Sequence, residues 1–196
     1  MNANEILGVL EQKGAVLRGH FELSSGRHSD VFVQKFRVLE HPRLAQRFGE
    51  SLAELFDNDF DVVAAPAVGA VVLGFTTALA GDARSIFAER SEGRLGFRRG
   101  FAIEPHERVL VVEDVVTTGG SAREVVDLVK ASGAEVVGVG ALLDRGGHSH
   151  SDAIAALGAP LRALVQLDVD SWERSECPLC ASNEPVEDPG SRRLGR

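Results

Sequence analysis

Residues 109–121 read VLVVEDVVTTGGS, and this stretch decides the fold class. Residues 108–112 are the most continuous β-branched run of the chain and predict a buried strand. Residues 117–121 form a turn rich in hydroxyl groups and glycine, and a helical pattern follows over residues 120–132. A strand, a polar glycine-rich turn and a helix, in that order, indicate a βα unit of an α/β protein.

The turn also has the composition of a phosphate site. The first N–H groups of a helix lack partners within the helix and carry partial positive charge, so a phosphate can bind there. Glu113 and Asp114 precede the turn at the carboxyl end of the strand, where open α/β sheets bind ligands. Carboxylates are poor phosphate ligands, but they accept hydrogen bonds from ribose hydroxyls and offset positive charge on a sugar. The stretch therefore predicts a sugar-phosphate site made of Glu113, Asp114, Val115, Val116, Thr117, Thr118, Gly119, Gly120 and Ser121.

The plainer alternative is an ordinary βα turn with a threonine N-cap and an acidic strand end. One threonine and one glycine would favour that alternative. The complete run of paired acids, threonines and glycines favours the ligand site. The chain has neither the Gly-Lys-Ser/Thr of a P-loop nor a Gly-x-Gly-x-x-Gly after this strand.

The rest of the chain alternates between strand and helix patterns, as a mostly parallel sheet flanked by helices requires. Residues 24–30 read as a polar turn, residues 69–80 as a helix buried nearly all round, and residues 89–100 as either a charged hairpin or a mobile loop. Beyond Asp170 the chain is polar and proline-rich, which predicts a loosely held tail. The expected helices cover residues 4–13, 41–56, 69–80 and 120–132, and the expected strands cover residues 15–23, 61–65, 83–88, 108–112, 135–143 and 161–167.

Composition narrows the function classes. The chain has 196 residues, 44% apolar and 26% charged, which is typical of a globular protein. A net charge of −8 argues against nucleic acid as a main partner. No run approaches the roughly 18 to 20 apolar residues that span a bilayer, and residues 1–5 lack the start of a secretory signal. We therefore expect no membrane partner and a cytoplasmic location.

Two cysteines, Cys177 and Cys180, exclude a disulfide framework and fit a reducing compartment. Their spacing is that of half a zinc knuckle, but structural zinc needs four ligands and the chain has no second cysteine pair. Reduced thiols in a tail or a local turn are favoured over a zinc site shared between subunits. The sequence leaves open whether His28, His148 or His150 contacts a ligand. For Phe32, a place in the core is favoured over packing against a pyrimidine ring.

Residues 109–121 resemble the signature of type I phosphoribosyltransferases. The similarity extends over about residues 14–167 and favours the orotate branch of that family: residues 23–30 resemble its substrate segment, residues 65–69 its pyrophosphate loop, and residues 143–145 its Leu-Asp-Arg. The resemblance implies the type I phosphoribosyltransferase fold, with a small substrate-side hood from residues 1–40 and a C-terminal part. It implies one domain over residues 1–170, a C-terminal tail over residues 171–196, and a homodimer.

The implied reaction transfers phosphoribosyl from phosphoribosyl pyrophosphate (PRPP) to N1 of orotate, with Mg²⁺ held mainly through PRPP and water. Residues 117–121 would bind the 5′-phosphate, and Glu113 with Asp114 would bind the ribose. Arg145 is the candidate for the orotate carboxylate, because a guanidinium can grip a carboxylate with two parallel hydrogen bonds. By the family match, Thr117 also touches the base. An ion pair between Arg145 and Asp144 is the plainer alternative.

The chain departs from the family's lysine pattern. Residues 89–100 correspond to the family's catalytic loop but contain neither lysine nor histidine, and Ser24 and Gly69 stand where family lysines occur. Arg90 matches a family arginine, so we assign it to PRPP binding and catalysis. We expect arginines and backbone amides to replace the missing lysines at the pyrophosphate. The further candidates, for which a solvated loop is an equal alternative, are Arg94, Arg98 and Arg99.

Two other functions fit parts of the sequence. A phosphoribosyltransferase for a purine or uracil would share the phosphate turn, but a neutral base needs no partner such as Arg145. A regulator that senses PRPP while binding nucleic acid would need a separate basic region, which the acidic balance opposes.

Overall fold

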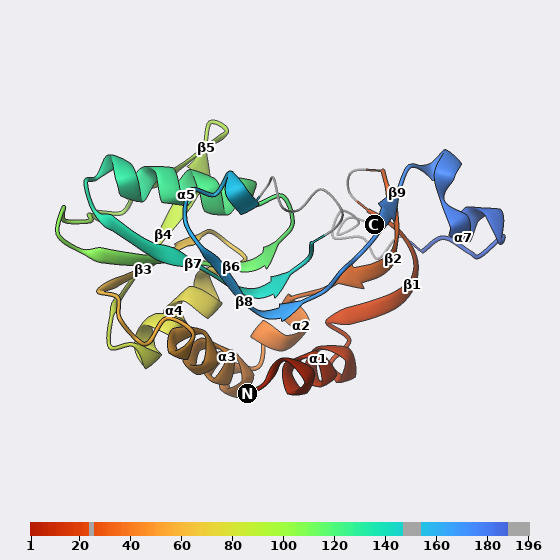
Figure 1. The fold of residues 1–196 in the computed structure, drawn as a ribbon, viewed down its shortest axis with the longest axis horizontal. Helices are drawn as coiled ribbons and strands as arrows, with labels where there is room; N and C mark the ends of the chain where they lie inside the picture. Colours follow the sequence, from red (N-terminus) through yellow and green to blue (C-terminus); the bar gives the residue numbers. More distant parts are fainter. Residues whose placement is uncertain (24–25, 147–153, 188–196) are drawn as a thin grey trace.

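The computed structural model describes residues 1–23, 26–146 and 154–187, and a six-stranded sheet lies at its centre (Figure 1). The strand order is β5-β4-β3-β6-β7-β8, and neighbouring strands are parallel except for β4 and β5. The prediction of a mostly parallel sheet is confirmed. The strands are β3 (Val62–Pro66), β4 (Arg84–Ser91), β5 (Arg94–Phe97), β6 (Arg108–Val116), β7 (Glu135–Asp144) and β8 (Leu161–Gln166).

Helices cover both faces of this sheet. Helices α1 (Ala3–Gln12), α3 (Pro42–Glu54) and α4 (Val71–Ala80) lie below it in Figure 1, and α5 (Gly120–Ala131) lies above it. Leu110 of β6 joins the core on one face and Val111 joins the core on the other. Because successive side chains of a strand point to opposite faces, a strand covered on both sides must be continuously apolar, as residues 109–112 are.

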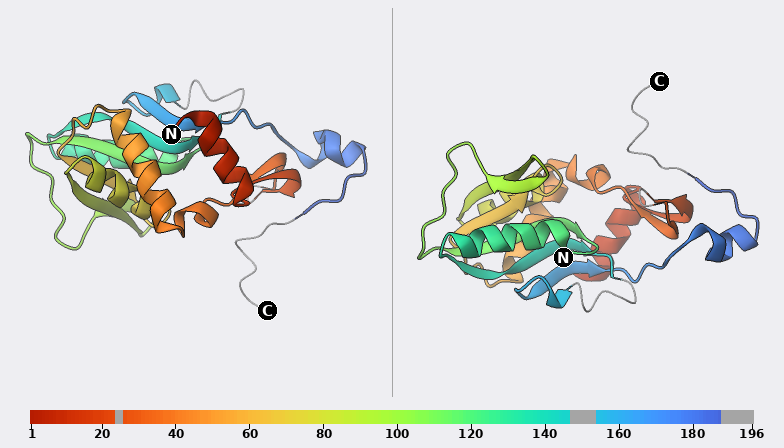
Figure 2. Two further views of the ribbon diagram at one scale, coloured as in Figure 1. Left: turned by 90° about the horizontal axis from the view of Figure 1, so that it is seen from below. Right: turned by 90° about the horizontal axis from the view of Figure 1, so that it is seen from above.

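A second, smaller sheet forms the hood that the family resemblance predicts. Its antiparallel strands are β1 (Val16–Glu22), β2 (His28–Val33) and β9 (Ser171–Trp172), in the order β1-β2-β9. The short helix α2 (Phe36–Leu39) connects β2 to α3. Figure 2 shows β1 and β2 at one end of the molecule, on the same side as the last helix, α7 (Pro178–Ala181).

Three local predictions were wrong. The expected turn at residues 24–30 is shorter, because His28 already belongs to β2. Helix α4 is not buried all round: Phe75 is 58% exposed and Leu79 is 62% exposed. The segment at residues 171–187, expected to be loosely held, contains β9, the 3-10 turn η1 (Arg174–Glu176) and α7.

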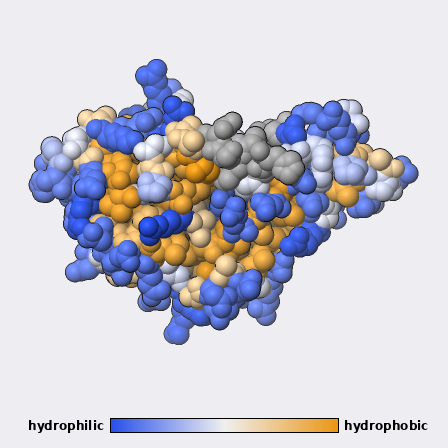
Figure 3. Space-filling view, in the orientation of Figure 1, coloured by the Kyte–Doolittle hydropathy of each residue, from blue (hydrophilic) through white to orange (hydrophobic). Residues whose placement is uncertain are grey.

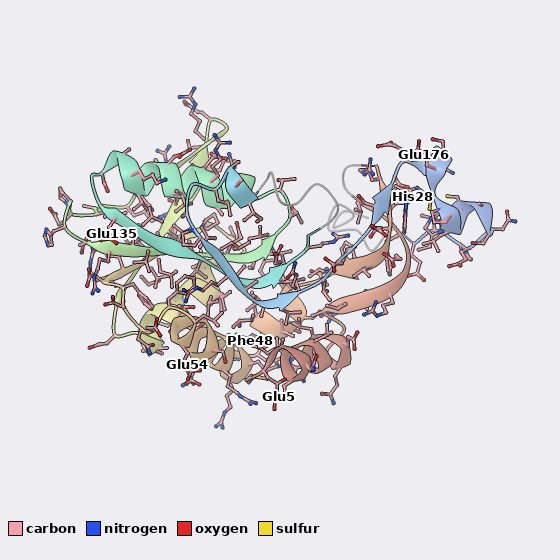
Figure 4. All side chains as sticks on the ribbon, viewed as in Figure 1. Glu5, His28, Phe48, Glu54, Glu135 and Glu176 are labelled. Carbon is pink, nitrogen blue, oxygen red and sulfur yellow. The ribbon has the colours of Figure 1, made fainter. Side chains whose placement is uncertain are left out.

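The surface and the core differ clearly in polarity. In Figure 4, Phe48 of α3 points toward the central sheet, where its side chain is fully buried. In the orientation of Figure 3, apolar residues gather over the central part of the molecule and hydrophilic residues surround them. Among the described helices, none combines the length and the apolar character needed to cross a bilayer.

Candidate functional site

The turn between β6 and α5 borders a cavity of about 260 Å³. Gly119 is the N-cap of α5, with φ 71°, and no side chain caps the helix. A threonine N-cap is therefore not formed, and the amides of the first helical turn are available to a ligand. A left-handed residue at this point suits glycine, which has no Cβ to clash. The cavity is lined by Glu113, Val115, Val116, Thr117, Thr118, Gly119, Gly120, Ser121 and Glu124.

The two acids of the motif lie in the last part of β6 and are nearly inaccessible. Glu113 is 9% exposed and Asp114 is 1% exposed. Asp114 Oδ2 lies 2.6 Å from Nζ of Lys35. Its Oδ1 accepts a hydrogen bond from the backbone of Val115 at 2.6 Å. An ion pair and a backbone donor together hold the Asp114 carboxylate in a fixed orientation.

Glu113 differs in charge from its neighbour. Burial, and then the charge of Asp114, raise the pKa of Glu113 to about 8. A buried carboxyl with a raised pKa keeps its proton at neutral pH, since ionisation would cost desolvation and repulsion. The pair therefore offers one neutral O–H donor and one anionic acceptor, which suits a ligand with neighbouring hydroxyl groups.

Lys35 was not among the predicted site residues. It follows β2 and reaches the carboxyl end of β6, so sequence distance concealed it. The one feature of the sequence that could have pointed to Lys35 is the small number of lysines, since only Lys13, Lys35 and Lys130 occur in the chain. Lys35 is one of these few lysines and lies within the predicted substrate-side hood, residues 1–40.

Gly69 packs directly against the pair of Lys35 and Asp114. A Cβ added to Gly69 would lie 2.1 Å from Oδ2 of Asp114 and 2.6 Å from Nζ of Lys35. The peptide bond between Ala67 and Val68 is cis. The structure thus brings residues 65–69 to the acid pair, and the amine of Lys35 lies beside Gly69, where the family pattern has a lysine.

Arg145 follows β7 at the same edge of the sheet and bridges to the hood. Its Nη2 donates hydrogen bonds to the hydroxyl of Ser29 at 3.1 Å and to the carbonyl of Val31 at 2.9 Å. Its backbone N–H donates to the carbonyl of Val116 at 2.8 Å, immediately before Thr117. Burial lowers the pKa of Arg145, and the charge of Asp30 opposes that shift. An arginine still keeps its charge, so a fixed cation lies between the turn at residues 117–121 and the hood.

Comparison with known proteins agrees with this geometry. Residues 37–154 match the phosphoribosyl transferase domain family. Over 195 residues the chain is 43% identical to the orotate phosphoribosyltransferase of Caldanaerobacter subterraneus subsp. tengcongensis, covering 99% of this chain and 100% of the relative. The chain belongs to the orotate phosphoribosyltransferase family. Its identity to the Thermotoga maritima orotate phosphoribosyltransferase is 46%, over 95% of this chain and 97% of the relative.

Solved structures of orotate phosphoribosyltransferases have the same fold. The Mycobacterium tuberculosis enzyme in complex with Fe(III) dicitrate superposes with a TM-score of 0.70 at 31% identity, over 83% of this chain and 95% of that chain. The same enzyme in complex with PRPP gives a TM-score of 0.64 at 28% identity, over 83% and 94%. The prediction of a type I phosphoribosyltransferase fold is confirmed.

The segment that corresponds to the family's catalytic loop is a hairpin of β4 and β5. Both residues of its two-residue turn have positive φ, 52° at Glu92 and 82° at Gly93, as a type I′ turn requires. Arg90 forms an ion pair at 2.8 Å with Glu124, which lines the cavity. Glu124 raises the pKa of Arg90, mainly through its hydrogen bonds.

The other described residues that the sequence suggested as ligand contacts do not line the cavity. Arg99 pairs with Glu89 at 2.8 Å. Arg94, where β5 begins, and Arg98, directly after β5, are exposed. His28 is 1% exposed and contacts His20, so it faces the hood interior. Phe32 packs near Phe21, with 5.8 Å between ring centroids. His148 and His150 lie outside the described residues, as does Ser24, which stands where the family has a lysine.

Proposed function

We propose that this chain transfers the phosphoribosyl group of PRPP to N1 of orotate, giving orotidine 5′-monophosphate and pyrophosphate. One arrangement carries the proposal: the N-terminus of α5, which no side chain caps, opens into the same cavity that Glu113 lines. A helix N-terminus attracts phosphate, and the neighbouring carboxyls match ribose hydroxyls. The family relationship adds the substrate class.

PRPP would bind with its 5′-phosphate on residues 117–121. The protonated Glu113 would donate a hydrogen bond to one ribose hydroxyl, and Asp114 would accept one from the other. In the reaction the bond from C1′ to the pyrophosphate oxygen breaks, a bond from C1′ to N1 forms, and the N1 proton leaves with the pyrophosphate. Positive charge that develops on the ribose would be offset by the anion of Asp114, which Lys35 and Val115 hold in place.

Orotate would lie between the phosphate turn and the hood. Arg145 supports this placement, because it follows the end of β7, is half-buried, and contacts β2 of the hood. A charged guanidinium in that position suits a carboxylate ligand. By the family match, Thr117 would also touch the base; it directly follows Val116, whose carbonyl accepts a hydrogen bond from the backbone of Arg145.

Mg²⁺ fits this pocket as a companion of PRPP. Mg²⁺ prefers oxygen ligands and keeps much of its hydration shell, so the diphosphate oxygens and water would supply most of its coordination. Glu113 lines the cavity and Asp114 is the next residue of β6, so the carboxylate of Asp114 would be the nearest anion to the hydrated ion. Bound there, the ion would neutralise charge on the leaving pyrophosphate.

The proposal includes the organisation of the protein. We take residues 1–170 as the catalytic domain and residues 171–196 as a C-terminal extension, and we place the enzyme in the cytoplasm as a homodimer. The two free thiols fit a reducing compartment. Exposed apolar side chains on α4, among them Phe75 and Leu79, favour self-association. Light scattering of the purified protein would measure the oligomeric state.

The deciding experiment supplies the protein with Mg²⁺, PRPP and one base at a time: orotate, uracil, hypoxanthine, guanine or adenine. Orotate alone should be consumed, with pyrophosphate released in equal amount. Turnover of a neutral base in its place would assign the chain to another substrate. Removing Arg90, Arg94, Arg98 and Arg99 together should slow the reaction, and an unchanged rate would refute their role at the pyrophosphate.

A further inference from the structure

Four side chains that bind metals in other proteins meet in the hood, away from the phosphate turn. His20 comes from β1, His28 from β2, and Cys177 and Cys180 from the segment at residues 171–187. One nitrogen or sulfur atom from each lies within 4.8 Å of all the others. Figure 4 shows His28 beside the part of the chain that carries Glu176, and the pairing of β2 with β9 confirms that neighbourhood.

The distances within this cluster resemble a tetrahedral ligand set. Nε2 of His20 lies 3.5 Å from Sγ of Cys177 and 3.7 Å from Sγ of Cys180, and Nδ1 of His28 lies 3.3 Å from Sγ of Cys180. Zinc bonds of about 2.05 Å to nitrogen and about 2.3 Å to sulfur, in tetrahedral geometry, separate nitrogen from sulfur by about 3.6 Å. The two histidine nitrogens are 2.7 Å apart, so the rings must separate slightly to admit an ion.

The hydrogen bonding of His20 leaves a lone pair directed at the cluster. Its Nδ1 lies 2.9 Å from the carbonyl of Glu184, which can only accept a hydrogen bond, so Nδ1 carries the proton. In a neutral ring Nε2 is then the basic nitrogen, and it faces both sulfurs. A ligand histidine that donates its other N–H to a backbone carbonyl is the usual arrangement around protein-bound zinc.

The cluster is also more buried than a pair of free thiols in a loosely held tail would be. His20 and Cys177 are each 3% exposed, and His28 is 1% exposed. Both cysteines are free. The sequence spacing alone offered two ligands and favoured plain thiols; the fold supplies the two histidines that complete a set of four. A shared site between subunits is not needed.

We propose that these four side chains bind one structural zinc ion, which joins the segment at residues 171–187 to β1 and β2. Two sulfur and two nitrogen ligands in tetrahedral geometry favour zinc, and four protein ligands leave no open position for catalysis. The ion would fasten β9 and α7 onto β1 and β2. It would thereby support Ser29 of β2, whose hydroxyl accepts a hydrogen bond from Arg145 and donates one to the carbonyl of Asp170.

The test begins with metal analysis of the full-length protein, purified without chelators or a metal-affinity step from medium containing zinc, iron and copper. We expect about one zinc per chain and neither of the other metals. Cobalt(II) bound in place of zinc should give the intense visible bands of a tetrahedral site with thiolate ligands. A wild-type protein without stoichiometric zinc, a protein loaded with iron or copper, or a Cys177–Cys180 disulfide would each overturn the proposal.

Variants assign the ligands. Cys177→Ser and His28→Ala should lose most of the zinc, whereas His28→Cys should retain it because a thiolate can replace the imidazole. His106→Ala, at an exposed histidine outside the cluster, is the matched control and should bind zinc like the wild type. Removing zinc from the wild type should lower the melting temperature by about 5 °C or more, and adding zinc should restore it. Zinc retained by both Cys177→Ser and His28→Ala would exclude this site, whatever the outcome of the orotate assay.

Discussion

The phosphate turn and the hood cluster are both built from a few polar side chains, but they are encoded differently. The turn at residues 117–121 and the two acids before it form one continuous stretch, residues 113–121, at the end of β6 and the start of α5. The hood cluster joins residues from both ends of the chain, since Cys177 meets His20 only after β9 pairs with β2. A continuous motif can be interpreted before the fold is known, whereas a cluster assembled by tertiary packing cannot. In the proposed function the two regions have different roles: the first would hold the sugar phosphate and the second would support the base side.

Asp114→Asn is expected to have the largest effect. The change keeps the shape but removes the anion next to the ribose, and it leaves Lys35 without its partner. Losing one such electrostatic contact at a reacting centre lowers kcat/KM by roughly 100-fold to 1,000-fold. Steady-state kinetics with PRPP as the varied substrate would measure it. Asp127→Asn, at an exposed acid of α5, is the control, and equal rates for both variants would remove Asp114 from the site.

Arg145→Ala tests the other side of the comparison. If the hood side binds the base, KM for orotate should rise by roughly 30-fold to 100-fold, as expected for losing a charged hydrogen-bond partner, while KM for PRPP changes little. Arg145→Lys should recover only part of the loss, because a lysine cannot make two parallel bonds. Arg43→Ala, at an exposed arginine of α3, is the control. Equal losses for both substrates would place Arg145 in the shared framework instead.

How far the sequence predicted each region follows from this difference. Residues 108–121 indicated the βα unit, the helix start and the acid pair, because the strand period and glycine pattern are local. Lys35 was missed because its contact with Asp114 depends on how the hood connects to α3. The exposed Phe75 on α4 was read as core, since an apolar helix has the same composition whether it faces a core or an open surface.

The cysteine interpretation shows the same limit. Counting ligands along the sequence found Cys177 and Cys180 and no second pair of cysteines. His20 and His28 belong to an unrelated stretch, and nothing in their spacing marks them as ligands. Only the antiparallel pairing of β1 with β2 places both rings on one side of the hood.

Glu113→Gln tests whether Glu113 is protonated in the folded protein, through the pH dependence of the free energy of unfolding. The pKa of Glu113 is about 8 in the folded protein and near the ordinary 4.5 in the unfolded chain. Between those values the folded state keeps a proton that the unfolded state has lost, so this residue makes the protein less stable as pH rises from about 5 to 8. Glutamine cannot ionise. The free energy of unfolding of the variant, minus that of the wild type, should therefore increase by at least about 2 kcal/mol over that range, since one pKa unit corresponds to about 1.4 kcal/mol.

Urea unfolding at pH 5, 6.5 and 8 would measure this difference. Glu135→Gln, at an exposed glutamate where β7 begins, is the control and should show no such growth. Figure 4 places Glu135 at the far end of the sheet from the hood. A stability difference independent of pH would mean that Glu113 is ionised throughout, and that the two acids bind ribose as a pair of anions.

Glu124→Gln should have the smallest effect, and it tests whether the hairpin belongs to the phosphate side. Glu124 lines the cavity and holds Arg90 at 2.8 Å, so it places a negative charge where PRPP would bring more. Removing that charge should release Arg90 toward the pyrophosphate and lower KM for PRPP by about two- to three-fold, since exposed ion pairs are weak. In the Arg90→Ala background the same change should have less effect on KM, because the residue it releases is gone. If Glu124→Gln instead raised KM for PRPP strongly, the ion pair would be a support of the site, and the hairpin would position the phosphate turn without touching pyrophosphate.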